Sequence, residues 1–210
     1  MFRSFPIITI SREFGSGGHS IGLALAERLG LPFYDKAIVT EAAEKSGYSE
    51  EFVAHQGEHL KPSERLLSRF LHSNAPGYAD PQDVLFEIQR TIILERAQSP
   101  CVIVGRAADH ILREAGIPAL NVFIYAGDSF RSARVLARYG ERDTDILSRL
   151  REKDQARAAF YQRYTGQRWG FAKNYDVCLN SGVLGVDTCV SILVDILREE
   201  DQRAQTAHDA

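Results

Sequence analysis

A glycine-rich loop near the amino terminus places the strongest constraint on the fold of this chain. Residues 7–10 form a short β-branched apolar run, GSGG occupies residues 15–18, and apolar residues recur every four positions from Ile21. This order predicts a buried strand, a tight loop and the start of a helix. Glycines let backbone amides turn inward, and the helix start adds its positive dipole end. The stretch therefore predicts a phosphate-binding loop, although a glycine-rich connection without a ligand would show the same pattern.

The loop departs from the phosphate-loop signature at one position. That signature ends in Gly-Lys-Ser/Thr, where the lysine reaches the β- and γ-phosphates and the hydroxyl binds Mg²⁺. No lysine occurs in this loop. Ser20 could supply the hydroxyl for Mg²⁺, or it could merely cap the helix. We expect six loop residues to hold the phosphates of a nucleotide: Gly15, Ser16, Gly17, Gly18, His19 and Ser20.

Four further apolar runs, separated by helical patterns, determine the predicted fold class. They cover residues 31–34, 101–104, 121–125 and 175–179. Helices are expected over residues 21–29, 37–45, 82–97, 128–142, 143–164 and 186–198, with a frayed tail after Glu199. Alternation of strands and helices predicts an α/β fold, a five-stranded parallel sheet flanked by helices. Because ligands bind beyond the carboxyl ends of such strands, we expect polar residues after the strands to meet at one edge.

Length, charge and cysteine content narrow the class of protein. The chain has 210 residues, 44% of them hydrophobic and 25% charged, which is typical of one globular domain. A net charge of −3 disfavours nucleic acid or an anionic membrane as a partner. Three cysteines without metal-type spacing are typical of a reducing compartment, and no apolar run approaches the roughly 20 residues that span a bilayer. We therefore expect a cytoplasmic protein that binds small molecules. The pattern does not indicate an oligomeric state.

Several motifs in combination resemble the cytidylate kinase-like branch of the nucleoside monophosphate kinases. They are SREFGSGGHSIGLALAERLGLPFYDKAIV, VIVGRAADHIL, NVFIYAG, KDQARAAFYQRYTGQRW and YDVCLNSG. The resemblance covers about residues 5–198 and implies a P-loop kinase fold with a variant phosphate loop. It further implies a phosphotransferase that uses ATP and Mg²⁺ to phosphorylate CMP or dCMP. One domain is then expected, with a core (about 5–45 and 82–198), a helical nucleotide-binding insertion (about 46–81) and an arginine-rich lid (about 138–172).

Comparison of the helix after the loop with this family puts the expected lysine at Gly18. We expect Arg12 to replace its charge, because a planar guanidinium can hold two phosphate oxygens at once. His19 is the weaker candidate, since a neutral imidazole carries no charge. The alternative for Arg12 is an exposed side chain that pairs with Glu13.

Residues after the second and third predicted strands match the acceptor side of these kinases. Asp35 and Lys36 stand where the family places a carboxylate near the acceptor nucleotide or the metal, while a helix N-cap is the plain alternative for Asp35. Arg106 stands where the resemblance implies a contact with the acceptor nucleotide. The aspartate that directly follows this arginine in the family is absent, and Asp109 lies one turn farther along.

Arginines in the second half of the chain resemble a lid that closes over the transferred group. Arg131, Arg134 and Arg138 are three and four residues apart, so they share one helix face. Asp154 and Arg157 resemble the D-x-x-R lid motif, in which the carboxylate meets the nucleotide sugar and the arginine meets phosphate. We expect Arg131, Arg134 and Arg157 to stabilise the transferred phosphoryl group. A solvated charged face is the alternative.

Two other functions remain open beside a CMP kinase. The same fold could phosphorylate a different small-molecule acceptor, because both the loop lysine and the family's aspartate are missing. A nucleotide-binding module with little transfer activity is also possible; the absent lysine favours it and the lid arginines oppose it. Tyr161, Tyr164 and Trp169 could stack on a base, although aromatics at helical spacing more often belong to the core.

Overall fold

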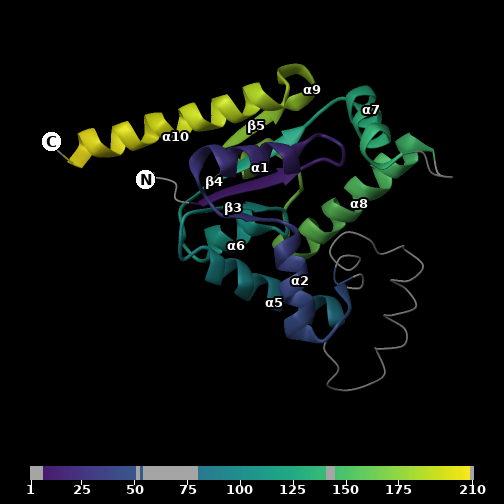
Figure 1. Ribbon diagram of the computed structural model, residues 1–210. Helices are drawn as coiled ribbons and strands as arrows, with labels where there is room; N and C mark the ends of the chain where they lie inside the picture. Colours follow the sequence, from purple (N-terminus) through teal and green to yellow (C-terminus); the bar gives the residue numbers. More distant parts are fainter. Residues whose placement is uncertain (1–6, 51–52, 54–79, 141–144, 209–210) are drawn as a thin grey trace.

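A five-stranded sheet with helices on both faces forms the centre of the protein (Figure 1). The computed structural model describes residues 7–50, 53, 80–140 and 145–208. All strand pairs are parallel, in the order β2-β3-β1-β4-β5. The strands are β1 (Ile7–Arg12), β2 (Phe33–Tyr34), β3 (Cys101–Val104), β4 (Ala119–Tyr125) and β5 (Val177–Asn180). The predicted five-stranded parallel sheet is therefore confirmed.

Most helices agree in position with the predicted ones, while the short elements at residues 172–174 and 181–184 were not predicted and the carboxyl end differs. The helical elements are α1 (Gly18–Leu29), α2 (Lys36–Ser46), α5 (Pro81–Arg96), α6 (Ala108–Glu114), α7 (Asp128–Tyr139), α8 (Ile146–Thr165), the 3-10 turn η1 (Ala172–Asn174), α9 (Ser181–Leu184) and α10 (Val186–His208). The expected frayed tail after Glu199 is wrong, because α10 continues to His208. Arg203 pairs there with Glu199 and Glu200, at helical spacings that support the last turns.

Two apolar layers cover the sheet. Ile8 and Ile10 of β1 face the layer made by α1 and α10, whereas Ile7 faces the layer made by α2, α5 and α6. Side chains of a strand alternate between its faces, and this central strand is buried on both. Its continuous apolar run is explained by that position. None of the helices within the described ranges is both long and apolar enough to cross a membrane.

The carboxyl ends of the strands meet at one edge of the sheet, as parallel topology requires. The loop after β1, the turn after β3 and the start of α7 lie at this edge, and α8 packs against α7 beside them (Figure 1). The turn after β5 is also tied to it, because Ser181 Oγ donates to the carbonyl oxygen of Ser16. Most of the expected insertion over residues 46–81 lies outside the described residues.

Candidate functional site

The loop between β1 and α1 is shaped by two glycines and by packing against α7. Gly15 and Gly17 have φ angles of 81° and 87°, in the left-handed region that favours glycine. A Cβ on Gly15 would lie 2.9 Å from the carbonyl oxygen of Arg131 and 2.9 Å from Val135, so α7 sits directly on the loop. Gly17 is the N-cap of α1, and no side chain caps that end. The first amides of α1 therefore remain available to an anion.

Arg134 of α7 lies over the same end of α1. Its Nη2 donates to Ser20 Oγ at 2.7 Å, and its guanidinium carbon lies 3.3 Å from where a Cβ on Gly17 would be. Ser20 is the third residue of α1, so the alternative that it caps the helix is wrong. A guanidinium and the positive end of a helix dipole thus face each other across one hydroxyl. A phosphate between them would be stabilised by both.

Arg131, one turn before Arg134, is buried among carboxylates. Its Nη1 lies 3.2 Å from Glu13 Oε2 and pairs with Asp154 Oδ2, while its Nη2 lies 3.4 Å from Asp128. Its side chain is 6% exposed. In this structure the charge of Arg131 is directed at these three acids and not toward the loop's open side.

The acids around Arg131 also hold the loop itself. Asp154 Oδ1 accepts a hydrogen bond from the Phe14 amide at 2.7 Å, and Glu13 Oε2 accepts one from the Ala126 amide at 3.1 Å. Burial raises the pKa of Glu13 above its ordinary value, against the opposing effects of that amide and of Arg131. Asp154 therefore ties α8 to the glycine loop, in addition to the sugar contact that the family resemblance implies.

Aromatic and guanidinium groups extend the contact between the lid helix α8 and the loop. Phe14 stacks on Tyr139 with ring centres 6.1 Å apart. The guanidinium carbons of Arg149 and Arg157 lie 5.8 Å and 5.7 Å from the Phe14 ring centre, within the range of cation–π attraction. Arg157 also donates to the carbonyl oxygen of Arg12 at 3.1 Å. Helix α8, which the sequence places in the expected lid, thus packs against the loop.

Arg12 leaves the end of β1 and passes over two glycines. A Cβ on Gly18 would overlap Arg12 Cβ and lie 2.8 Å from its Cγ, and a Cβ on Gly105 would overlap its Nη1. The stem of Arg12 thus fills the space of the side chain that the family resemblance expects at position 18. Its Nη2 lies 3.7 Å from Asp35 Oδ1, and its side chain is 15% exposed. The alternative of an exposed Arg12 is therefore wrong.

Asp35 connects the glycine loop to Arg12. It occupies the N-cap position of α2, but its carboxylate makes no capping hydrogen bond, so the N-cap alternative is wrong. Asp35 Oδ2 instead lies 2.6 Å from His19 Nδ1, and the His19 ring packs edge-on against Phe33 at 5.3 Å. Lys36 is the first residue of α2 and is exposed. The structure therefore brings His19, Asp35 and Arg12 together, with Lys36 next to them in the chain.

Three consecutive residues after β3 have left-handed backbone angles. The φ angles of Gly105, Arg106 and Ala107 are 78°, 58° and 54°. A residue with a Cβ pays about 1–2 kcal/mol in this region, and such strain is found mostly at functional sites. Neither arginine nor alanine favours these angles, so sequence reasoning had no signal for the strain. Arg106 and Ala107 of this turn both line a pocket with Arg12 and Arg157.

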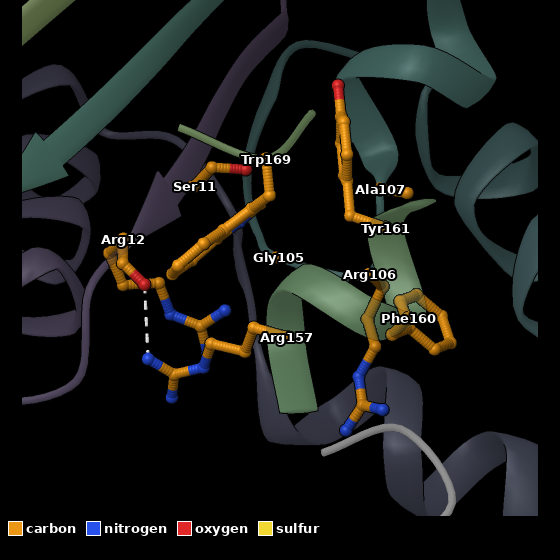
Figure 2. A pocket seen from close by; sticks show the side chains of 9 residues that line it. All are labelled: Ser11, Arg12, Gly105, Arg106, Ala107, Arg157, Phe160, Tyr161 and Trp169. Carbon is orange, nitrogen blue, oxygen red and sulfur yellow. Dashed lines mark hydrogen bonds between the residues drawn. The ribbon is translucent and has the colours of Figure 1, made fainter. Parts of the chain in front are cut away.

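A small polar pocket lies between these arginines (Figure 2). Figure 2 shows Arg12 and Arg157 on one side of it and Arg106 with Phe160 on the other. The pocket encloses about 30 Å³, room for one or two water molecules. Nine residues line it: Ser11, Arg12, Gly105, Arg106, Ala107, Arg157, Phe160, Tyr161 and Trp169. Sequence reasoning did not single out Ala107 and Phe160 as site residues, although both lie in motifs that resemble the family.

Asp109 and two of the three candidate stacking aromatics serve the packing. Asp109 is 2% exposed, and its Oδ2 accepts a hydrogen bond from the Tyr161 hydroxyl at 2.6 Å. Burial raises the pKa of both groups, and the tyrosine hydroxyl points away from the pocket in Figure 2. Tyr164 stacks on Phe86 with ring centres 4.0 Å apart. Trp169 lines the pocket and packs edge-on against Phe123 at 5.3 Å.

The loop has groups that could hold the phosphates of a nucleotide and a magnesium ion. The uncapped amides of α1 and the Arg134 guanidinium suit the phosphates of ATP. Ser20 Oγ would hold Mg²⁺ once Arg134 turns from it to the phosphates. Among the residues that the structure describes, no group of three His, Cys, Asp or Glu side chains could hold a metal. The other ligands of Mg²⁺ would be phosphate and water oxygens, which this ion commonly keeps.

Comparison with known proteins places this geometry in a wider group. The model of the cytidylate kinase-like family matches residues 7–183. No curated protein matches the sequence. An uncharacterized protein from Eubacterium ventriosum is similar, with 25% identity over 91% of this chain and 98% of that chain and a TM-score of 0.68.

Two kinases of known structure share the fold at lower identity. A shikimate kinase from Bacteroides thetaiotaomicron is 17% identical over 91% of this chain and 98% of its own, with a TM-score of 0.56. A gluconokinase from Sinorhizobium meliloti is 17% identical over 94% of this chain and 97% of its own, with a TM-score of 0.51. These likenesses confirm the predicted P-loop kinase fold.

Proposed function

The chain belongs to the cytidylate kinase-like family, and we propose that it transfers the γ-phosphoryl group of ATP to CMP or dCMP. The observation that supports this best is the convergence of Arg12, Arg106 and Arg157 on one pocket beside the glycine loop. Guanidinium groups bind phosphate oxygens in pairs, so these three side chains suit an acceptor phosphate. The glycine loop at the same edge of the sheet suits the donor phosphates.

Transfer of a phosphoryl group from one phosphate to another requires little covalent chemistry from the protein. The acceptor oxygen is already ionised at neutral pH, so catalysis consists of holding donor and acceptor in line and offsetting the charge on the moving group. Arg12 lines the pocket and is suited to the acceptor phosphate. Mg²⁺, when bound, neutralises part of the phosphate charge. The pocket must enlarge to admit a nucleotide, so the proposal requires α8 to move outward with Arg157 and Phe160.

A second candidate keeps the fold and changes the acceptor to a small hydroxyl compound. The 2.6 Å contact between Asp35 and His19 favours it, because such a pair can take the proton of a hydroxyl, which a phosphate acceptor does not need. The burial of Asp109 also favours it, because this carboxylate is committed to Tyr161 and does not reach an acceptor base.

An ADP-release assay with Mg²⁺, ATP and a panel of acceptors tests both proposals. The panel contains CMP, dCMP, UMP and AMP, together with shikimate and gluconate as hydroxyl acceptors. Saturable turnover on CMP or dCMP supports the first proposal, and turnover confined to a hydroxyl compound supports the second. Binding of ATP without turnover on any acceptor would instead favour a nucleotide-binding module.

Two arginine variants show whether the pocket is the acceptor site. Arg106→Ala should raise the KM for the acceptor and leave the KM for ATP nearly unchanged. Arg90→Ala is the matched control, because Arg90 lies on α5 with a side chain 39% exposed and pairs only weakly with Glu87 at 4.0 Å. Equal kinetics of the two variants would contradict the assignment of the pocket.

A further inference from the structure

We infer that Arg134 supplies the positive charge that the missing loop lysine would bring to the β- and γ-phosphates of ATP, and that Arg12 serves the acceptor. The inference rests on the proposed phosphoryl transfer. It assigns Arg134 to the donor, ATP, and Arg12 to the acceptor. From sequence, Arg12 is the first candidate for the lysine's role. Geometry around the loop separates the two arginines.

Arg134 lies against the part of the loop where donor phosphates bind. Its guanidinium covers Gly17, with Nε and the central carbon each 3.3 Å from the position of a Cβ there. Its Nη2 bonds Ser20 Oγ, the hydroxyl that the phosphate-loop signature assigns to Mg²⁺ beside the β- and γ-phosphates. A ligand that replaced this one hydrogen bond would find the guanidinium already in place.

Among the described residues, Arg134 differs from Arg131 in its carboxylate partners. No described carboxylate forms an ion pair with it, whereas Arg131 on the same helix contacts three. It lies against the amino-terminal end of α1, whose amides have no side-chain cap. Two positive groups this close together favour the binding of an anion at this end of the helix. A triphosphate supplies the missing charge.

Arg12 points to the opposite side of the site. Its guanidinium reaches Gly105 after β3 and approaches Asp35 after β2, the two strand ends that face the acceptor. The pocket that it lines contains no residue of the glycine loop (Figure 2). Its stem also excludes a side chain at Gly18, because a Cβ there would overlap it. The chain therefore has no room for the usual lysine while Arg12 crosses the loop.

His19, the other basic residue of the loop, is also turned away from the donor. Its Nδ1 lies 2.6 Å from Asp35 Oδ2, on the acceptor side. Among the residues that the structure describes, Arg134 is therefore the cation at the donor end of the loop. During transfer, a bond forms between the acceptor oxygen and the γ-phosphorus while the bond to the bridging oxygen breaks and ADP leaves with the electron pair. Arg134 would meet the charge that collects on ADP.

Calorimetric titration of ATP, ADP and AMP tests this division without any acceptor. Arg134→Ala should lower the affinity for ATP and for ADP about tenfold or more, which is the value of one charge-assisted contact. The affinity for AMP, which lacks the β-phosphate, should fall much less. Arg134→Lys keeps the charge and should recover part of the loss. Arg138→Ala is the matched control on α7, since Arg138 lies over the Tyr139 ring at 5.7 Å and makes no hydrogen bond or ion pair with a described residue of the loop.

Arg12→Ala completes the test. It should leave ATP affinity close to that of the unmodified protein and raise the acceptor KM about tenfold or more. The inference is overturned if Arg12→Ala weakens ATP more than Arg134→Ala does, or if Arg134→Ala behaves as Arg138→Ala. Urea unfolding of each variant shows that its fold is intact, and Arg134→Gln replaces any Arg134→Ala sample that is not.

The two levels of proposal fail in different ways. An unmodified protein that binds ATP but phosphorylates no acceptor contradicts the proposed function, while the affinities still decide the role of Arg134. If Arg134→Ala keeps both its turnover and its ATP affinity, only the assignment of Arg134 to the donor and Arg12 to the acceptor is overturned. An unmodified protein that does not bind ATP overturns both.

Discussion

Two arginines at the glycine loop are held in place by opposite means. Arg131 is fixed by attraction, with carboxylates from the loop, from α7 and from α8 around its guanidinium. Arg12 is placed by clearance, because its stem and its head cross Gly18 and Gly105, where any Cβ would overlap it. Around Arg131, the loss of any one carboxylate would disturb the cluster. Around Arg12, the arrangement depends on the lack of a side chain at Gly18 and at Gly105.

The difference bears on which arginine can work on a ligand. A guanidinium matched by buried carboxylates gains little by turning to a phosphate, since the turn would leave those acids without their partner. Arg12 lines the small polar pocket, where an acceptor phosphate is proposed to bind. The carboxylate-locked region thus maintains the shape of the loop, and we propose that the glycine-cleared region serves binding.

The largest expected effect is the loss of Arg131. Arg131→Met would leave Glu13 and Asp154 without their cation, so we expect the free energy of unfolding to fall by about 3–5 kcal/mol. Urea unfolding measures it. Arg138→Met, on the same helix, should change the value by less than about 0.5 kcal/mol. If Arg131→Met kept its stability but lost turnover, Arg131 would act on the transferred group as predicted from sequence, and the comparison would fail.

A methyl group at position 18 tests whether Arg12 needs the space that Gly18 leaves free. Gly18→Ala should lower the free energy of unfolding by about 1–3 kcal/mol through overpacking, although alanine is the better helix former. In the Arg12→Gly background the same substitution should be neutral or stabilising. A double-mutant cycle by urea unfolding measures this coupling. Additive effects of the two substitutions would show that Arg12 does not require the space at position 18.

A smaller gain is expected at the strained turn beside the cleared pocket. Ala107 has a φ of 54°, so Ala107→Gly should raise the free energy of unfolding by about 0.5–1 kcal/mol. Ala108→Gly, at the first residue of α6, should lower it by up to about 1 kcal/mol. Thermal unfolding of both variants gives the comparison. Equal destabilisation by the two would mean that the turn at residue 107 is not strained.

The smallest effect concerns the proton affinity of Glu13 in the locked region. Burial raises the Glu13 pKa above its ordinary value of 4.5, so the folded protein holds this proton more tightly than the unfolded chain. The stability from this group is therefore complete below about pH 4.5 and declines as the pH rises through the folded pKa.

Glu13→Gln removes this titration and keeps the shape of the side chain. The free energy of unfolding of the unmodified protein, minus that of the variant, should fall as the pH rises from 4 to about 7. Urea unfolding across this range measures the difference. A difference that rose with pH would mean that Arg131 outweighs burial at this carboxyl group.

The fold followed from features that are local in the sequence. Each strand is an apolar run bounded by glycine, proline or a polar turn, and alternation with helices leaves a parallel sheet as the simplest arrangement. Because that sheet gathers the carboxyl ends of its strands, the order of the strands along the chain was enough to predict Arg12, Asp35 and Arg106 at one edge. The continuation of α10 to His208 was missed, since it depends on ion pairs among residues that look like a tail.

The sequence could not predict which residues, far apart in the chain, contact one another. Arg131 and Arg134 share a helix face by spacing, yet one meets Asp154 on α8 and the other meets Ser20 on α1. Asp109 is buried because Tyr161, 52 residues away, covers it. Spacing defines which residues lie together on one element. It does not define what the neighbouring element brings to them.

Trp169 gives the pocket an optical property of its own. It is the chain's one tryptophan, it lines the pocket with Arg12 and Arg157, and its ring lies edge-on to Phe123 at 5.3 Å. Indole emission shifts with the polarity around the ring, so the native tryptophan fluorescence of this protein originates at the pocket alone. Entry of an anion, or an outward movement of α8, would change that spectrum without any dye attached to the chain.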